Sequence, residues 1–503
     1  MTAPLTIRLH PSDNVVVARM DILPGTKVEG EVAAATRVPP GHKILTRSVK
    51  KGEPLRKYNQ IIGFATEDLG PGTHIHTHNC VMGDFERDYA FCADAHPTDF
   101  IVPPAAFQGY RRADGRAATR NYIGIVTTVN CSAATSRMIA SRLAPLLEEF
   151  PNIDGIVPLT HGGGCGMAAS GLEMDVLRRT LAGYTKHPNM AAVVVLGLGC
   201  ETNQISGLMN AEGLKEGPKL IPMAIQDEGG VSKTVMRAVG FLKEILPDAN
   251  AVKREPIPAS ELILALQCGG SDGYSGISAN PALGAAVDLL VRNGGTAVLS
   301  ETPEIYGAEH LLTRRAVSKD VGEKIVERIR WWEDHCARTG GEMNNNPSPG
   351  NKAGGLTTIL EKSLGAVAKG GTTNLVDVYK YAEPITAKGF VYMDSPGYDP
   401  VSATGQVAGG ANVLCFTTGR GSVFGCKPTP SLKLATNTSL YRRMTDDMDI
   451  NCGTIVDGEE TIQENGRRIF DLILATASGQ KTKSEVLGIG DDEFEPWKIG
   501  ATM

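Results

Sequence analysis

Residues 121–130, NYIGIVTTVN, form a short apolar run rich in β-branched side chains, and this run predicts a buried strand. The segment that follows, residues 132–150, spaces its apolar residues by three and four, which is typical of a helix with one buried face. The pattern continues with a strand at 153–160, a helix at 174–187 and a strand at 190–199. Apolar strands that alternate with helices predict a parallel sheet covered on both faces.

The alternation breaks at residues 246–260, which contain three prolines, and it then resumes. Further strands are expected at 261–267, 296–301, 390–395, 411–419 and 432–437, and further helices at 282–294, 321–337 and 464–479. We therefore predict a middle α/β domain at 109–250 and a C-terminal α/β domain at 256–503. One divided sheet is the alternative.

Residues 1–82 have a different pattern. The short β-rich segments TIRLH, NVVVARM, HKILTRSV and IIGFAT are separated by turns that contain Pro and Gly. This pattern predicts a small N-terminal all-β domain. Residues 83–108 are irregular and acidic, and we interpret them as a linker.

The composition is that of a globular protein, with 503 residues, 42% hydrophobic residues and 21% charged residues. A net charge of −6 without a basic block argues against nucleic acid as a partner. No apolar run reaches the roughly 18 residues of a membrane span, and the first residues lack the apolar core of a signal peptide. We therefore expect a cytoplasmic protein whose ten cysteines are free thiols or metal ligands.

Four cysteines lie where a predicted strand ends. They are Cys131, Cys165, Cys200 and Cys268. Ligands of parallel sheets bind beyond the carboxyl ends of the strands, and thiolates suit iron, zinc or an iron–sulfur cluster. These four residues are the predicted metal ligands. The alternative is that each is a small buried apolar side chain.

Histidines and glutamates supply the candidate acid–base groups. His74, His76 and His78 alternate, which on a strand would place all three on one face, where they could bind a metal or act as a base. His161 lies close to Cys165, and Glu301 and Glu304 follow another predicted strand. We predict His76, His161 and Glu304 as catalytic groups.

Three loops dense in Gly, Ser and Asn form a candidate anion site, at residues 269–281, 344–355 and 417–421. The predicted substrate-binding residues in them are Ser271, Asp272, Asn280, Asn351, Lys352 and Arg420. Neither a GxxxxGK[ST] motif nor a strand–GxGxxG–helix motif is present, so ATP and NAD lack their usual signatures. A small anionic polyol fits better than a nucleotide.

Long and unusual strings run through nearly the whole chain. They are DNVVVA, GHK, IGFA and HIHTHN in the first 80 residues, and GYRRADGRAATRNYI, VNC, GLGCE, QCGGSD, YSGISANP, NPSPGNKAGG and FTTGRG beyond them. By these strings the sequence resembles the altronate and galactarate dehydratases and the related sulfolactate sulfo-lyases.

The resemblance implies an N-terminal β-clip domain of the SAF type, a middle domain that forms a homodimer, and a Rossmann-like C-terminal domain with a metal site. It also implies dehydration of a hexonate or hexarate to a 2-keto-3-deoxy acid. Ferrous iron, either mononuclear or in an iron–sulfur cluster, is the expected cofactor, and Mn²⁺ is a substitute. The alternatives are a sulfolactate-type sulfo-lyase, a non-catalytic sugar-acid binding protein and an oxidoreductase.

Overall fold

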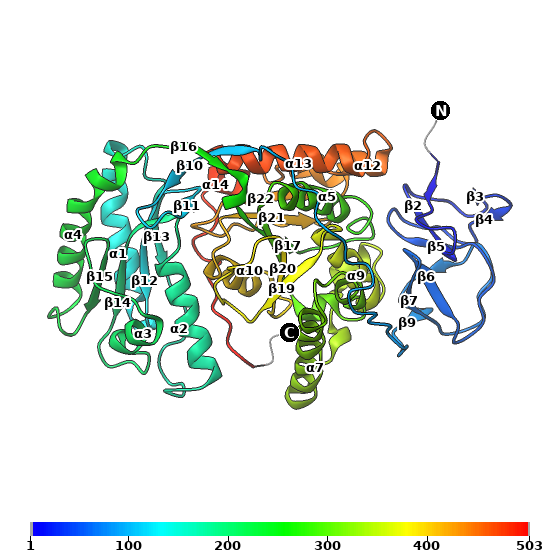
Figure 1. The fold of residues 1–503 in the computed structure, drawn as a ribbon. Coiled ribbons are helices and arrows are strands. Elements are labelled where there is room, and N and C mark those ends of the chain that lie inside the picture. Colours follow the sequence, from blue (N-terminus) through cyan, green and yellow to red (C-terminus); the bar gives the residue numbers. More distant parts are fainter. Residues whose placement is uncertain (1–3, 501–503) are drawn as a thin grey trace.

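The computed structural model describes residues 4–500. Its chain forms a small β-rich domain at one end, a large α/β domain in the centre and a smaller α/β domain at the other end (Figure 1). This arrangement confirms the predicted class, which is α/β with an N-terminal all-β domain.

The N-terminal domain is built from short antiparallel strands. One sheet has the order β1-β2-β5-β8, with strands Thr6–Ile7, Val15–Ala18, Lys43–Leu45 and His74–Ile75. A second sheet, β6-β7-β9, contains Pro54–Lys57, Gln60–Ala65 and Cys80–Val81, and β3 (Lys27–Glu29) pairs with β4 (Val32–Ala33). Val16, Val38 and Ile44 form a small core between these strands.

The middle domain contains a parallel sheet of order β13-β12-β14-β15, with strands Gly155–Leu159, Tyr122–Thr127, Met190–Gly197 and Leu220–Ala224. Its helices are α1 (Ala133–Leu143), α2 (Leu172–Thr185), α3 (Ile205–Glu212) and α4 (Val231–Ala251). Ile123 and Ile125 of the central strand pack with α1 and α4. Tyr122 and Val126 belong to the other core, which includes residues of α2. Both faces of the sheet are therefore covered, as predicted.

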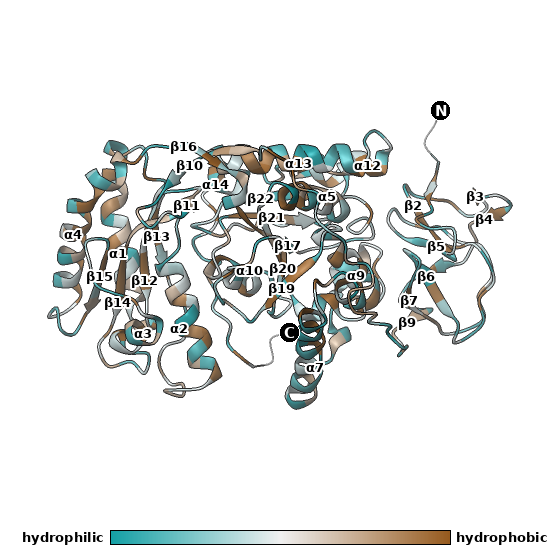
Figure 2. Cartoon of the chain, in the orientation of Figure 1, coloured by the Kyte–Doolittle hydropathy of each residue, from teal (hydrophilic) through white to brown (hydrophobic). Residues whose placement is uncertain are grey.

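Helix α4 runs through part of the predicted break. It continues to Ala251 with Pro247 inside it, so the expectation of a break from residue 246 was wrong. Leu242, Leu246 and Ala249 of this helix are buried against the sheet. Packing on both sides of Pro247 therefore outweighs the helix-breaking tendency of proline. The outward turns of α4 are hydrophilic, whereas hydrophobic residues gather within the sheets (Figure 2).

The C-terminal domain contains a parallel seven-stranded sheet of order β19-β20-β18-β17-β21-β22-β23. Its strands are Leu375–Tyr379, Phe390–Met393, Thr296–Leu299, Ile263–Cys268, Val413–Thr418, Ser431–Ala435 and Ile450–Asn451. The longer helices are α5 (Ala279–Arg292), α7 (Lys319–Thr339), α9 (Ile359–Val367), α10 (Asp399–Ala408) and α13 (Ile462–Ala477). The shorter ones are α6 (His310–Thr313), α8 (Pro349–Ala353), α11 (Thr438–Arg443), α12 (Gly453–Asp457) and α14 (Lys483–Leu487).

Residues 84–105 form a strap along the C-terminal domain, between the N-terminal domain and β10 (Ala106–Arg111) (Figure 1). Ion pairs hold the strap to that domain: Arg87 to Glu309 at 2.8 Å, Asp94 to Arg314 at 2.7 Å and Asp99 to Arg292 at 2.9 Å. Strand β10 then pairs with β11 (Ala117–Ala118) and β16 (Glu255–Pro258), where the chain enters and leaves the middle domain.

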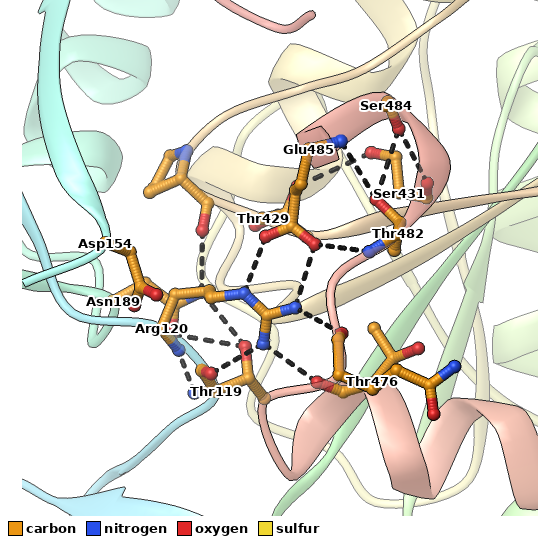
Figure 3. Close-up of polar contacts among 12 residues, drawn as sticks. Thr119, Arg120, Asp154, Asn189, Thr429, Ser431, Thr476, Thr482, Ser484 and Glu485 are labelled. Atoms are coloured by element: carbon orange, nitrogen blue, oxygen red, sulfur yellow. Dashed lines mark hydrogen bonds and ion pairs between the residues drawn. The ribbon is translucent and has the colours of Figure 1, made fainter. Parts of the chain in front are cut away.

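Arg120 joins the middle domain to the C-terminal domain (Figure 3). Its guanidinium donates to both carboxylate oxygens of Glu485, at 2.6 and 2.9 Å, and to the carbonyl oxygens of Thr476 and Gln480. The Arg120 side chain is buried, so its charge is compensated entirely by these partners. None of the described helices is long and apolar enough to cross a membrane.

Candidate functional site

A buried cluster of charged side chains lies at the carboxyl edge of the central sheet. Cys268 ends β17, and Glu301 and Glu304 follow β18. The thiol and one oxygen of each carboxylate lie within 4.8 Å of one another, and all three side chains are buried. The Cys268 thiol is 3.5 Å from the Glu304 carboxylate.

Two buried lysines complete this cluster. Lys369 Nζ lies 2.9 Å from the Cys268 sulfur and 3.7 Å from the Glu301 carboxylate. Lys362, on α9, forms an ion pair with Glu304 and donates to Asn346 Oδ1 at 2.9 Å. Two positive charges are thereby placed next to two carboxylates inside the protein.

The electrostatics of the cluster reflect its burial. Burial, together with the neighbouring Glu304, raises the pKa of Glu301 well above its usual value. The same two causes raise the pKa of Asp399, at the start of α10, to about 7. Burial also raises the pKa of the Cys268 thiol to about 12. In the absence of a further positive charge, burial therefore favours the protonated forms of Glu301 and Cys268.

The cluster fits a bound cation. Both Glu301 carboxylate oxygens are buried without a hydrogen-bond partner in the part of the chain that the structure describes, and a buried polar atom of this kind is costly unless it gains a partner. The backbone of Glu301 has φ +74°, a strained conformation for a non-glycine residue. Thiolate and carboxylate ligands together are compatible with Fe²⁺ or Mn²⁺.

A cavity of about 290 Å³ opens onto the cluster. Its lining includes Cys268, Glu304, Asn346, Ser348, Asn351, Lys362, Tyr398 and Asp399. The volume is at the lower end of the range for small-molecule sites, and the wall offers amide, hydroxyl, ammonium and carboxylate groups beside apolar surface. The amide, hydroxyl and ammonium groups among them could bind a small polyhydroxy anion.

The structure assigns several predicted substrate-binding residues to internal hydrogen bonds. Asn280 donates to the Gly365 carbonyl at 2.9 Å and accepts from Thr417 at 2.6 Å. Asn351 accepts from the backbone N–H of Ser348, the N-cap of α8, donates to the Ser271 carbonyl at 2.9 Å and also lines the cavity. Of these residues, Asn351 is therefore placed to contact a ligand, whereas Asn280 is buried away from solvent.

A second cavity, of about 490 Å³, lies between the N-terminal and C-terminal domains. Asp272 and Arg420 line it, together with Arg19 and Arg443. The Asp272 carboxylate already accepts from Thr436 at 3.0 Å and from other neighbours. Arg420 is exposed and free to meet an anion.

The histidines of the N-terminal domain form a cluster that differs from the prediction. Strand β8 ends at Ile75, so the expected strand face of three histidines was wrong. Asn79 causes the difference: its side chain accepts from the His76 backbone N–H at 2.9 Å and donates to the His74 carbonyl at 3.0 Å, which turns the chain. The rings nevertheless gather, with centroids 5.7 Å apart for His74 and His76.

The histidine cluster faces the C-terminal domain. His42 joins it, with Nδ1 3.0 Å from the Nε2 atom of His74. His76 Nε2 lies 2.8 Å from the carbonyl oxygen of Lys352 in α8. Ser348 and Asn351, also at α8, line the smaller cavity. The N-terminal domain therefore supports one wall of that cavity.

The remaining predicted residues lie in the middle domain. His161, Cys131, Cys165 and Cys200 follow strands of the four-stranded sheet, whereas Cys268 belongs to the seven-stranded sheet. Both ring nitrogens of His161 are engaged, with the Thr127 carbonyl at 3.0 Å and the Gly163 N–H at 3.1 Å. The structure therefore does not group the four predicted metal ligands in one site.

Sequence reasoning missed Lys362, Lys369, Asp399 and His42. A signal for the lysines was present, because residues 359–370, ILEKSLGAVAKG, place two lysines and Glu361 in a helical segment that is mostly apolar. Charged residues inside apolar segments are rarely buried unless they are paired. Asp399 and His42 carried no comparable pattern.

Comparisons with known proteins agree with this architecture. Residues 4–83 match the altronate/galactarate dehydratase SAF domain, residues 109–250 the second domain of D-galactarate dehydratase/altronate hydrolase, and residues 259–502 the C-terminal domain of D-galactarate/altronate dehydratase.

Individual relatives match over most of the chain. An altronate dehydratase of Bacillus subtilis is 35% identical over 505 residues, covering 99% of both chains. A galactarate dehydratase (L-threo-forming) of Escherichia coli is 36% identical over 486 residues, covering 94% of this chain and 93% of the relative. The beta subunit of a (2R)-sulfolactate sulfo-lyase of Chromohalobacter salexigens is 33% identical over 76% of this chain and 95% of its own length.

The fold, the buried acid–lysine cluster and these matches define an enzyme of the hydro-lyase class. The chain belongs to the altronate/galactarate dehydratase family.

Proposed function

We propose that the protein dehydrates a sugar acid, a hexonate or hexarate such as altronate or galactarate, to a 2-keto-3-deoxy acid. The observation that carries this proposal is the buried group of Cys268, Glu301 and Glu304 at the floor of a polar cavity. The cavity offers amide, hydroxyl and ammonium groups to a substrate that is rich in hydroxyls and carries a carboxylate.

Cys268, Glu301 and Glu304 would hold a divalent cation, with ferrous iron as the proposed cofactor and Mn²⁺ as its substitute. Such a cation supplies Lewis-acid stabilisation to the negative charge that develops when the proton next to a carboxylate is removed. Glu301 and Glu304 repel each other in their buried environment, and a cation held between them would relieve that repulsion.

The side chains of the cavity perform the remaining steps. Ser348, Asn346 and Asn351 orient the hydroxyls of the substrate by hydrogen bonds. The Asp399 carboxylate takes the proton from the carbon next to the substrate carboxylate. The Lys362 ammonium gives a proton to the departing β-hydroxyl, which leaves as water. The resulting enol tautomerises to the keto acid.

Glu304 supports this chemistry rather than exchanging the proton itself, because Lys362 and Asn346 both bind its carboxylate. His76 contributes by holding α8 from the side of the N-terminal domain. A role of His76 as acid or base remains a prediction. Substitution of His76 distinguishes acid–base catalysis from support of α8. Loss of an acid or base lowers kcat, whereas displacement of α8 weakens substrate binding and raises KM.

The test is turnover of purified protein under anaerobic conditions with ferrous iron and a dithiol. Altronate, galactarate, glucarate and sulfolactate are offered separately, and 2-keto-3-deoxy acid and sulfite are measured. Formation of a keto acid from one sugar acid supports the proposal. Release of sulfite from sulfolactate, without reaction of any sugar acid, would assign the chain to the sulfo-lyase activity that the name of its Chromohalobacter relative states.

A further inference from the structure

Three of the ten cysteines are exposed, and all three lie on the middle domain. They are Cys131, Cys165 and Cys200, whereas the other seven are buried or half-buried. Cysteine is among the residue types most often found inside proteins. Three exposed thiols in one small domain therefore indicate a function for the sulfur atoms.

The topology places these cysteines at one edge of the four-stranded sheet. Cys131 follows β12, Cys165 follows β13 and Cys200 follows β14. Strand β12 is the direct parallel neighbour of both β13 and β14. The carboxyl ends of the three strands are therefore adjacent, and the three loops leave the sheet side by side.

Hydrogen bonds tie the three loops together within a few residues of each cysteine. The Asn130 N–H donates to the Gly163 carbonyl at 3.1 Å, and the Asn203 N–H donates to the Gly164 carbonyl at 2.9 Å. Asn203 Nδ2 also donates to the Thr128 carbonyl at 3.2 Å. The loop after β14 thus contacts both of the others, and the cysteines are held on a connected framework.

The loops approach as closely as backbones allow. A Cβ atom on Gly164 would lie 2.1 Å from the carbonyl oxygen of Thr128, and φ of Gly164 is +95°, so this position requires glycine. On the opposite side, Glu201 accepts from Thr128 Oγ1 at 2.7 Å and from the Gly199 N–H at 2.6 Å. The Gln226 amide donates to the Cys200 sulfur at 3.4 Å. The edge is therefore a closely packed framework, and the Cys200 sulfur on it acts as a hydrogen-bond acceptor.

We propose that Cys131, Cys165 and Cys200 bind a cuboidal iron–sulfur cluster, one cysteine to each of three irons. A single tetrahedral ion requires ligand sulfurs about 3.8 Å apart. Among the described residues, these three sulfurs do not lie within 4.8 Å of one another as a set. A cluster accommodates the wider spacing, because each cysteine binds a different corner of the cube.

Two side chains near the three loops are already engaged, so neither would serve as a ligand of the fourth iron. His161 is the histidine nearest to Cys165 in the sequence, and both of its ring nitrogens are already engaged in hydrogen bonds. Glu201 is engaged by Thr128 and Gly199. A cavity of about 160 Å³ adjoins the site and is lined by Cys165, Glu173 and Lys498, among others. The Lys498 ammonium in the lining would favour a small anion in this cavity.

This site is separate from the Cys268 cluster, which lies on the other sheet, and the inference does not depend on the proposed function. The experiment is anaerobic reconstitution of the full-length protein with ferrous iron and sulfide, followed by removal of unbound iron. We expect about four sulfide per chain and about four iron beyond any iron held by the Cys268 group, broad absorption in the blue region, and a paramagnetic signal after reduction.

Single variants Cys131→Ser, Cys165→Ser and Cys200→Ser should each lose most of the iron, the sulfide and the colour. Their thermal unfolding should change little in the iron-free state, because the side chains are exposed. Cys92→Ser, at a half-buried cysteine of the strap, is the matched control and should keep the cluster. Cys268→Ser should also keep it, even where turnover is lost.

Three outcomes would overturn the inference. One is iron without sulfide, and another is a single zinc ion bound by the three cysteines. The third is full iron and sulfide content in the three serine variants. The readouts are iron, sulfide and spectra rather than turnover. A failed dehydration assay would therefore not count against the iron–sulfur cluster.

Discussion

Lys43 Nζ lies 2.8 Å from the Glu361 carboxylate, and neither side chain has exposed surface. Lys43 belongs to the N-terminal domain and Glu361 to α9 of the C-terminal domain, so this ion pair fastens one domain to the other. Lys57 adds a second contact to the same carboxylate, at 3.0 Å. Burial by itself would raise the pKa of Glu361, but the two lysines lower it to about 2.

Glu361→Gln should destabilise the protein by about 3–5 kcal/mol, because it leaves two buried lysines without their counter-charge. Denaturant unfolding measures the change. Lys50→Ala is the matched control, since Lys50 and Asp68 form an exposed pair in the same domain and should contribute at most about 1 kcal/mol. Equal losses in the two variants would contradict the fastening role of Glu361.

Glu301→Gln should reduce bound iron and turnover without reducing the stability of the metal-free protein. The Glu301 carboxylate has no hydrogen-bond partner in its buried position, and burial raises its pKa. Removing a buried carboxylate that accepts no hydrogen bond, and whose ion pair with Lys369 is long at 3.7 Å, should leave the melting temperature of the metal-free protein unchanged or higher. Metal analysis and thermal unfolding with and without iron check this. A large drop in metal-free stability would show that Glu301 has a structural role instead.

The stability of the protein should fall as the pH falls from about 6.5 to about 4. Burial lowers the pKa of His42 to about 4 and that of His74 to about 3. Between these values and the ordinary value near 6.5, the unfolded chain binds protons that the folded chain does not, so acid favours unfolding. Above pH 6.5 this contribution is fully present.

Denaturant unfolding at a series of pH values measures this slope. His74→Gln should make it shallower, whereas His10→Gln, at an exposed position, should leave it unchanged. Other histidines and carboxylates contribute to the total slope, so the difference between the two variants is the informative quantity. If the unfolding free energy depended on pH equally in the two variants, His74 would not contribute to the acid destabilisation.

Arg120→Met should weaken the contact between the middle and C-terminal domains by about 3–5 kcal/mol, because the buried Glu485 carboxylate loses its partner (Figure 3). Arg116→Met is the control, since Arg116 pairs with Asp114 at an exposed position. Two separate unfolding transitions in Arg120→Met would show that the domains have become uncoupled.

The sheets could be predicted because local pattern and tertiary structure agree in them. Residues 122–126 are an unbroken run without charged side chains, and the strand Tyr122–Thr127 is buried on both faces. The end of α4 could not be predicted from Pro247, because its position depends on packing against the sheet rather than on local preference. The turn after Ile75 depends on the Asn79 side chain, which a strand pattern does not reveal.

The candidate site was only partly predictable for a similar reason. Cys268 and Glu304 stand directly after apolar strands, where sequence reasoning searches for ligands. Lys362 and Lys369 reach the same place from the helical segment 359–370, and Asp399 reaches it from the start of α10. Their convergence is a property of the seven-stranded sheet and its helices, and it leaves no fixed spacing in the sequence.

The strap of residues 84–105 tethers the N-terminal domain, which supports α8 and thereby one wall of the cavity next to Cys268. Because this domain and the cavity wall belong to one chain, their association is unimolecular, and dilution does not separate them. The tether raises the local concentration of the N-terminal domain far above the concentration of the protein in solution. The geometry of the cavity wall should therefore be the same at the low enzyme concentrations of an assay and at the high concentrations used for spectroscopy.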